Sequence, residues 1–232
     1  MELPIEFRNI TEELAAGIPV KKLISAANAI SERYRSEAAS GKPLITNDTE
    51  AAAYAIVRMP ATIGASGSAM QYAADRYDGE ICSVLDIGAG TGACSWAAAE
   101  IFPDIEKITC LEREKSMIDF GRTLMEKADF PFECQWISRD ITEGFDIKAD
   151  LVTASYVLNE MPAAMQEKLV SAMWNSAEKM LVIIEPGTPK GFKNILRIRE
   201  QLIGKGAKIL APCPHCDNCA LPEDDWCHFT AR

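Results

Sequence analysis

Long apolar runs are missing from this 232-residue sequence. None approaches the roughly 20 consecutive apolar residues that a membrane-spanning helix needs. The first residues, MELPIEFRNITEELAAG, also lack the basic start and the apolar stretch of a secretion signal. We therefore expect no membrane partner and a location in the cytoplasm.

An excess of positive charge is missing as well. The formal net charge is −10, which excludes a protein that wraps nucleic acid with its whole surface. One segment differs, because residues 187–210 carry one acidic side chain, Glu200, against six basic ones: Lys190, Lys193, Arg197, Arg199, Lys205 and Lys208. We interpret this basic segment either as a solvated helix face or as a patch that faces RNA.

Disulfides are not expected, because the thiols of a cytoplasmic protein stay reduced. Four of the eight cysteines are scattered singly, and we expect them to be small buried hydrophobic residues: Cys82, Cys94, Cys110 and Cys134. The other four lie within residues 211–229, APCPHCDNCALPEDDWCHF, together with both histidines of the sequence. This concentration of soft ligands indicates a separate role for that segment.

Helical spacing of apolar residues dominates the N-terminal third of the chain. We predict helices over residues 20–38 and 65–77. Between them, Asn47 or Asp48 can cap a further helix, which Pro60 would end.

From residue 81 onward, short β-like runs alternate with helical patterns. The runs are ICSVLDI, KITCLE, FECQWI, ADLVTAS and KMLVIIE. This alternation predicts βαβ units and a mainly parallel sheet that is covered on both faces. We therefore divide the chain into a helical N-terminal region (1–78), an α/β core (79–210) and a cysteine-rich segment (211–232).

The first β-like run leads into a glycine-rich loop, VLDIGAGTGACSWAAAE. Gly88, Gly90 and Gly92 permit positive φ and a close approach of the backbone to a ligand, at the sheet edge where open α/β folds bind ligands. A dinucleotide fingerprint has the spacing G-x-G-x-x-G, whereas this loop has G-x-G-x-G. The spacing favours S-adenosylmethionine (SAM) over a dinucleotide, and a degenerate pocket that holds nothing is the third alternative.

Three carboxylates strengthen the SAM interpretation. Glu112 ends the second run, where it can accept hydrogen bonds from both ribose hydroxyls. Asp140 follows the third run and can reach the adenine amino group. Asp86 precedes the glycines and can orient the loop and meet the ammonium of the methionine moiety. Each alone could be a helix cap or a solvated loop charge, but three in register with one loop favour a SAM pocket.

Catalytic residues remain unassigned from the sequence. The fourth run is followed by SYVLNEMP, which places Tyr156, Asn159 and Glu160 near the expected position of a methyl acceptor. An N-P-P-Y motif is absent there, and no cysteine after the fourth or fifth run is placed as a nucleophile. Methyl transfer from SAM needs mainly proximity and alignment, because the sulfonium is already activated. The missing motif therefore does not exclude activity.

The cysteines of the C-terminal segment form the array C-x2-C-x2-C-x7-C: Cys213, Cys216, Cys219 and Cys227. The first three have the spacing by which one tight loop ligates a [4Fe-4S] cluster. Zinc is the alternative, with four thiolates or with three and a histidine, and a metal-free loop is the third. The firmest ligands are Cys213, Cys219 and Cys227. Cys216 competes with His215, with His228 or with a residue beyond the end of this chain for the fourth place.

These motifs together resemble a known family. AYAIVRMPATIGA, LDIGAGTGACSWAA, DLVTASYVLNEMP, VIIEPGTPKGF and the C-P-H and W-C-H-F elements occur in the order typical of methyltransferase-like proteins associated with the mitochondrial small ribosomal subunit, and of their bacterial and archaeal relatives. The resemblance covers residues from about Tyr34 to Arg232. Where relatives commonly have an acidic residue after C-P-H, this chain has Cys216, which favours an in-loop fourth ligand.

The resemblance implies a class I SAM-dependent methyltransferase (Rossmann-like) fold, a role in small-subunit assembly or translation through rRNA contact, and a four-cysteine iron-sulfur cluster. Our principal hypothesis is a SAM-binding, methyltransferase-like protein that binds or methylates the rRNA of the small ribosomal subunit. The alternatives are a non-catalytic ribosome-assembly factor and a small-molecule or protein methyltransferase with a structural zinc.

Overall fold

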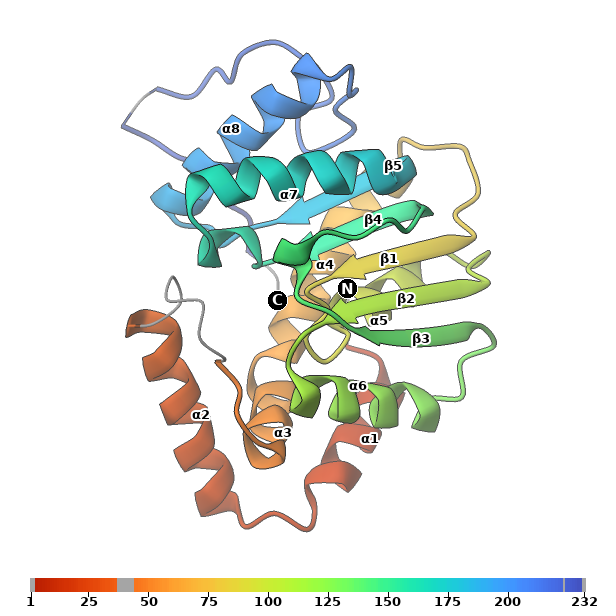
Figure 1. Ribbon diagram of the computed structural model, residues 1–232, viewed down its shortest axis with the longest axis vertical. Coiled ribbons are helices and arrows are strands. Elements are labelled where there is room, and N and C mark those ends of the chain that lie inside the picture. The colour runs from red at the N-terminus through yellow and green to blue at the C-terminus, as the bar shows by residue number, and fades with distance from the viewer. Residues whose placement is uncertain (1–2, 37–43, 223, 231–232) are drawn as a thin grey trace.

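The computed structural model describes residues 3–36, 44–222 and 224–230, and Figure 1 shows a parallel sheet with helices on both faces. The strands are β1 (Ser83–Ile87), β2 (Lys107–Glu112), β3 (Glu133–Ser138), β4 (Ala149–Ser155) and β5 (Ala177–Ile184). They pair in parallel in the order β3-β2-β1-β4-β5. This doubly wound order reverses between β1 and β4, which is where such sheets bind ligands.

The helices that follow β1 and β2 pack together in one hydrophobic cluster, whereas those that follow β4 and β5 pack together on the opposite face of the sheet, as right-handed crossovers require for this strand order. They are α5 (Ala93–Ile101), α6 (Lys115–Lys127), α7 (Ala163–Ser176) and α8 (Pro189–Gly204). Short 3-10 turns follow β3 and β4, at Ile141–Glu143 and Leu158–Glu160.

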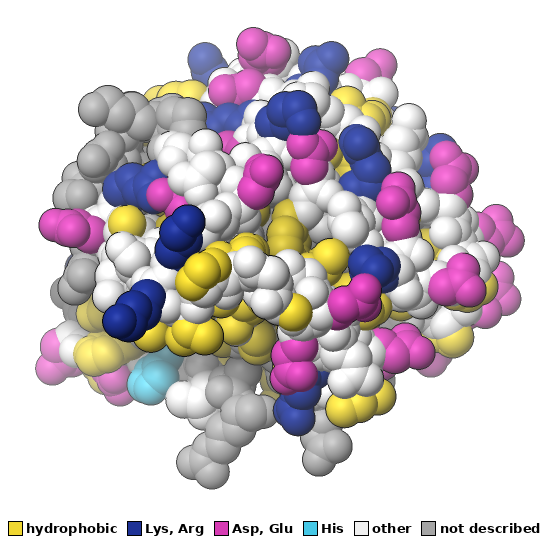
Figure 2. Space-filling view, turned by 90° about the horizontal axis from the view of Figure 1, so that it is seen from below, with side chains coloured by type: hydrophobic (Ala, Val, Ile, Leu, Met, Phe, Trp, Pro, Cys, Tyr) yellow, Lys and Arg dark blue, Asp and Glu magenta, His cyan; other side chains and the backbone are white. Residues whose placement is uncertain are grey.

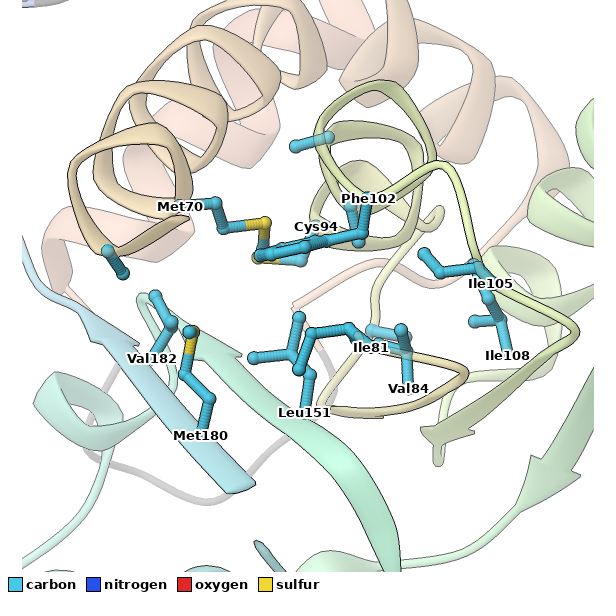
Figure 3. Close-up of a cluster of buried hydrophobic side chains, with 14 of the residues drawn as sticks. Met70, Ile81, Val84, Cys94, Phe102, Ile105, Ile108, Leu151, Met180 and Val182 are labelled. Atoms are coloured by element: carbon cyan, nitrogen blue, oxygen red, sulfur yellow. The ribbon is translucent and has the colours of Figure 1, made fainter. Parts of the chain in front are cut away.

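Apolar side chains fill both interfaces of the sheet. On one face Met70 and Cys94 pack toward Leu151 and Val182 from the strands, as Figure 3 shows. On the other face α7 and α8 bury their apolar sides against β1 and β4, with residues such as Val170 at the centre. The strands alternate between these two layers, which accounts for their near-continuous apolar sequences.

The N-terminal part contains α1 (Ile5–Ala15), α2 (Val20–Ser36), α3 (Asp48–Val57) and α4 (Met59–Ala74). Helix α2 is confirmed within the described residues, and positions 37–38 of that prediction lie outside them. Asn47 is the N-cap of α3, because its side chain accepts a hydrogen bond from the Glu50 N–H at 3.0 Å. The prediction omitted α1, although Phe7 and Ile10 have helical spacing and are buried.

The predicted start of the last N-terminal helix was wrong. Helix α4 begins at Met59 rather than at residue 65, and Pro60 lies in its first turn. Proline is tolerated there because the first-turn N–H groups have no partner within the helix. Pro60 therefore ends one helix and also begins the next.

The N-terminal helices are attached to the carboxyl side of the sheet. The Glu114 carboxylate, at the start of α6, accepts hydrogen bonds from the N–H groups of Leu44 and Ile45 at 2.9 and 2.8 Å. Phe7 of α1 packs edge-on against Trp96 of α5, with ring centroids 5.4 Å apart. These contacts hold α1–α3 beside the edge where ligands bind in this class of fold.

Candidate functional site

A cavity of about 840 Å³ lies at the carboxyl ends of the strands. Its wall includes Gly88 and Gly90 of the glycine loop, Glu112 after β2 and Asp140 after β3. The sheet therefore brings together four of the six residues predicted to bind the cofactor. The volume is in the range of small-molecule and cofactor sites.

The glycine loop adopts the backbone conformation expected from its sequence. Gly88, Gly90 and Gly92 all have positive φ, at 64°, 59° and 90°. A Cβ on Gly88 would lie 2.7 Å from Cγ2 of Val157, so this position also lacks room for a side chain. Gly92 does not line the cavity; it is the residue that caps the N-terminus of α5.

Glu112 connects the glycine loop to the turn after β2. One carboxylate oxygen accepts the Gly90 N–H at 2.9 Å. The other accepts the N–H groups of Arg113 and Glu114, at 2.7 and 2.9 Å. Glu112 is 9% exposed, and a carboxylate with about four acceptor positions keeps room for a further donor.

Asp140 caps the short turn after β3 and faces the same cavity. Its Oδ1 accepts hydrogen bonds from the backbone N–H and the hydroxyl of Thr142, at 2.9 and 2.7 Å. Arg113 lies 3.6 Å from the other oxygen. The Thr142 hydrogen bonds, followed by the Arg113 charge, hold the pKa of Asp140 below its usual range.

Asp86 lies beneath the cavity and is not part of its wall. It is 1% exposed, and its carboxylate accepts hydrogen bonds from the N–H and hydroxyl of Ser95, at 3.2 and 2.8 Å, and from the Thr153 hydroxyl at 2.9 Å. Burial raises its pKa to about 6, against these hydrogen bonds. These contacts suit a residue that orients the loop; contact with a methionine ammonium stays a prediction.

The N-terminal helices contribute a wall of the cavity that sequence reasoning missed. Tyr34 of α2, Tyr54 of α3 and Arg58 line it opposite the sheet residues named above. The Arg58 guanidinium lies 5.0 Å from the centre of the Tyr34 ring and donates to the Ser31 hydroxyl at 3.1 Å. Tyr54 and Arg58 lie within the AYAIVRMPATIGA element, but nothing in the sequence assigned them to the cavity, because their position depends on how α2 and α3 pack against the sheet.

The segment after β4 supplies the remaining wall. Tyr156 has φ of 61°, a left-handed conformation that is uncommon for a residue with a side chain and is concentrated at functional sites. Glu160 follows within the same wall. Burial, and then the charge of Glu112, raise the pKa of Glu160 to about 8, and burial raises that of the neighbouring Glu185 to about 7.

The cysteine-rich segment is an irregular loop. Cys213, Cys216 and Cys219 are exposed and Cys227 is half-buried, all as free thiols. Burial, and then the charges of Cys213 and Cys219, raise the pKa of Cys227, whereas the Cys216 thiol contacts the Ala207 carbonyl at 3.8 Å. Among the residues described, no group of three or more side chains stands in a metal-holding arrangement.

The scattered cysteines follow the expectation only in part. Cys94 and Cys110 are buried, whereas Cys82, just before β1, and Cys134, in β3, are half-buried.

The basic segment forms α8 and the turn after it, and two of its arginines have partners within the protein. Arg197 donates to the Gln166 side chain, and Arg199 donates to the His215 carbonyl at 2.5 Å. The lysines are exposed instead: Lys190, Lys193, Lys205 and Lys208. On the face shown in Figure 2, the coloured basic and acidic side chains are interspersed.

Comparison with known families identifies the relationship. A family described as "Mitochondrial small ribosomal subunit Rsm22" matches residues 48–232 of this chain. The chain belongs to the Rsm22 family. The resemblance inferred from the sequence motifs is therefore confirmed, and so is the class I methyltransferase fold, which is carried by the strand order and the glycine loop.

A human relative is named "Ribosome assembly protein METTL17, mitochondrial". It is 24% identical to this Rsm22-family chain over 164 residues, which cover 64% of the chain and 36% of the human protein. The chain thus matches about a third of that protein's length.

Solved methyltransferase structures are also similar to this chain. Mitomycin 7-O-methyltransferase MmcR is 14% identical with a TM-score of 0.49, over 86% of this chain and 67% of the other. Magnesium protoporphyrin IX methyltransferase from Synechocystis PCC 6803 is 13% identical with a TM-score of 0.47, over 75% and 84%.

No helix in the described part of the chain is both long and apolar enough to cross a membrane. The cytoplasmic location stays a prediction, and the family description names a mitochondrial ribosome.

Replacing Glu160 by Gln is expected to stabilise the protein at alkaline pH. The pKa of Glu160 in the folded state is about 8, above its ordinary value of 4.5. Its contribution to stability is therefore full below pH 4.5 and is lost as the pH rises through 8. At pH 8.5 we expect Glu160→Gln to have a free energy of unfolding roughly 2–4 kcal/mol above that of the parent protein.

Urea unfolding followed by circular dichroism at pH 5 and pH 8.5 checks this. At pH 5 the difference between the two proteins should shrink to about 1 kcal/mol or less, and Glu167→Gln on the exposed side of α7 should match the parent at both values. A Glu160→Gln protein that is no more stable than the parent at pH 8.5 would contradict the expectation.

Proposed function

We propose that this protein binds SAM in the cavity at the carboxyl edge of its sheet and acts in the assembly of the small ribosomal subunit, by binding or methylating its rRNA. The proposal that the cavity binds SAM rests on the glycine loop, which places Gly88 and Gly90 in the cavity wall beside Glu112 and Asp140. Family membership supports the ribosomal half.

The residues present fit SAM. The positive φ of Gly88 and Gly90 leaves the loop backbone open to a close ligand. Glu112 would accept the ribose hydroxyls, and Asp140 would accept the adenine amino group. Bound SAM would supply a methyl group already activated on a sulfonium.

Asp86 would hold the loop from below, because its carboxylate is already bonded to α5 and β4. Tyr34, Tyr54 and Arg58 would cover the cofactor from the side of the N-terminal helices. The protein would thus bind, orient and shield the cofactor from water.

The ribosomal role extends what the relatives' names state. The human relative is named a ribosome assembly protein, and this chain matches 36% of it. The exposed lysines on and after α8 are the groups that would contact phosphates of rRNA. Arg197 and Arg199 are engaged within the protein and would instead position that helix.

The cysteine-rich segment would hold a metal centre. After burial, the charges of Cys213 and Cys219 raise the pKa of Cys227, which supports these three residues as ligands of a [4Fe-4S] cluster. Cys216 would be the fourth ligand, after its thiol turns away from the Ala207 carbonyl. A zinc ion in the same loop is the alternative, with His215 or His228 in the fourth place.

A non-catalytic assembly factor is the second candidate function. The segment after β4, from Tyr156 to Glu160, lacks an N-P-P-Y motif. In that case SAM would stabilise the folded protein without donating its methyl group. A methyltransferase acting on a small molecule or a protein, with a structural zinc, is the remaining alternative.

Calorimetric titration with SAM tests the cofactor half. Gly90→Asp should abolish detectable binding, because the loop backbone has φ of 59° there and a new carboxylate would repel Glu112. Gly206→Asp, after α8, is the matched control: its φ is also positive, at 93°, and an added Cβ meets nothing within 4 Å, so SAM binding should be unchanged. Failure of the parent protein to bind SAM would contradict the proposal.

Association with small-subunit rRNA tests the ribosomal half. The double change Lys190→Glu and Lys193→Glu should lower co-purified small-subunit rRNA several-fold and reduce the salt dependence of binding. Lys21→Glu with Lys22→Glu, on exposed positions of α2, makes the same change in charge elsewhere and should leave association unchanged. Equal losses of co-purified rRNA in both double variants would show that the net charge of the protein, rather than the lysines of α8, determines the association. That result would contradict the proposed contact surface.

Metal analysis of protein purified without oxygen tests the cysteine-rich segment. We expect about four iron and four sulfide per chain, with a visible absorption band. Cys219→Ser should lose both, whereas Cys82→Ser, at a half-buried position before β1, should retain them. One zinc without a visible band would favour the zinc alternative, and no metal at all would contradict the proposed centre.

A further inference from the structure

Four carboxyl groups line the cavity, and three of them have partners within the protein. Glu112 accepts three backbone N–H groups, and Glu114 accepts two. Asp140 is bonded to Thr142 and faces Arg113. Within residues 3–36, 44–222 and 224–230, the Glu160 carboxyl group has neither a hydrogen bond nor an ion pair.

The surroundings of Glu160 raise the free energy of its ionised form, because no partner compensates the charge. Its side chain is largely withdrawn from water by the turn after β4 and by the tyrosines of α2 and α3, and its charge raises the pKa of both Tyr34 and Tyr54. Arg113 is the cation that acts on it, but its guanidinium lies against Asp140. The ionised form of a carboxyl group that is withdrawn from water without a partner is destabilised. A cationic ligand in the cavity would remove that cost.

We propose that Glu160 is the counter-ion of the sulfonium of bound SAM, a role that rests on the proposed function. SAM carries a positive charge on sulfur, and its product S-adenosylhomocysteine (SAH) has a neutral thioether there. A carboxylate that faces the sulfur therefore favours the methyl donor over the product. This subsite would give the cavity its preference for SAM and help release of SAH.

The ammonium of the methionine moiety is the other cation that SAM could present to Glu160. Both SAM and SAH carry that ammonium, so a carboxylate paired with it would favour neither ligand. Comparing the affinities for SAM and SAH therefore shows whether Glu160 pairs with the sulfonium or with the ammonium.

Ionisation of Glu160 adds a second readout. The groups that face it are the acids Glu112, Glu114 and Glu185, the Arg113 guanidinium, and the neutral phenols of Tyr34 and Tyr54. With burial, the acids raise its pKa to about 8, so the free protein holds a proton on this group at pH 7. A sulfonium beside it lowers the pKa, and SAM binding then releases about one proton.

The experiment is calorimetric titration of the full chain with SAM and with SAH, at pH 7 in phosphate and Tris and at pH 8.5. In the parent protein, SAM should bind more tightly than SAH at pH 8.5 and release a proton at pH 7, and SAH should release none. Glu160→Gln should lower the affinity for SAM roughly tenfold at pH 8.5, leave that for SAH within about twofold, and abolish the proton release. Glu167→Gln is the control and should behave as the parent.

Three results overturn the inference. Equal losses of SAM and SAH affinity in Glu160→Gln would place the carboxylate at the ammonium. Unchanged affinities with unchanged proton release would remove Glu160 from the site while leaving the proposed SAM pocket intact. No binding of either ligand to the parent protein would overturn the proposed function and this inference together.

Discussion

The buried Asp86 carboxylate is the interaction on which the site depends. In the sheet register Asp86 lies opposite Thr153 of β4 and Cys110 of β2, and it bonds to the Thr153 hydroxyl and to Ser95 in the first turn of α5. Ser95 in turn contacts the Cys110 thiol at 3.3 Å. One side chain thus joins β1, β4 and α5 at the point where the strand order reverses. The glycine loop above it and the Tyr156 turn beside it take their positions from this junction.

The N-terminal helices form the part of the cavity wall that the sheet does not supply. A parallel sheet with a glycine loop offers an open edge, and the cavity becomes enclosed because α2 and α3 bring Tyr34, Tyr54 and Arg58 over that edge. The attachment is specific, since Glu114 accepts two backbone N–H groups from the segment that joins those helices. In this chain the helical region therefore contributes to the cavity wall as well as covering the sheet, which explains why that wall contains acids from the strand ends and aromatic groups from the helices.

Local patterns predicted much of this arrangement. Strand positions, the glycine loop and the N-cap Asn47 follow from residues close in sequence, and all were found. The predicted start of α4 at residue 65 was wrong because proline can begin a helix as well as end one, and only packing decides. Glu160 was placed near the acceptor by its position after β4, yet its lack of a partner depends on elements more than a hundred residues away. The same limit applies to the pairing of Arg197 and Arg199, which looked free in the sequence.

The proposed function requires that one cavity, built jointly by the glycine loop and the N-terminal helices, holds SAM. Hydrogen–deuterium exchange of the full chain with and without SAM measures this directly, because a ligand slows exchange in the backbone segments that it contacts or orders. We expect slower exchange in three separate segments together, namely residues 84–95, 54–62 and 156–162. Protection of the glycine loop without any change in residues 54–62 would contradict the joint cavity, and no protection in any of the three would contradict SAM binding at this edge of the sheet.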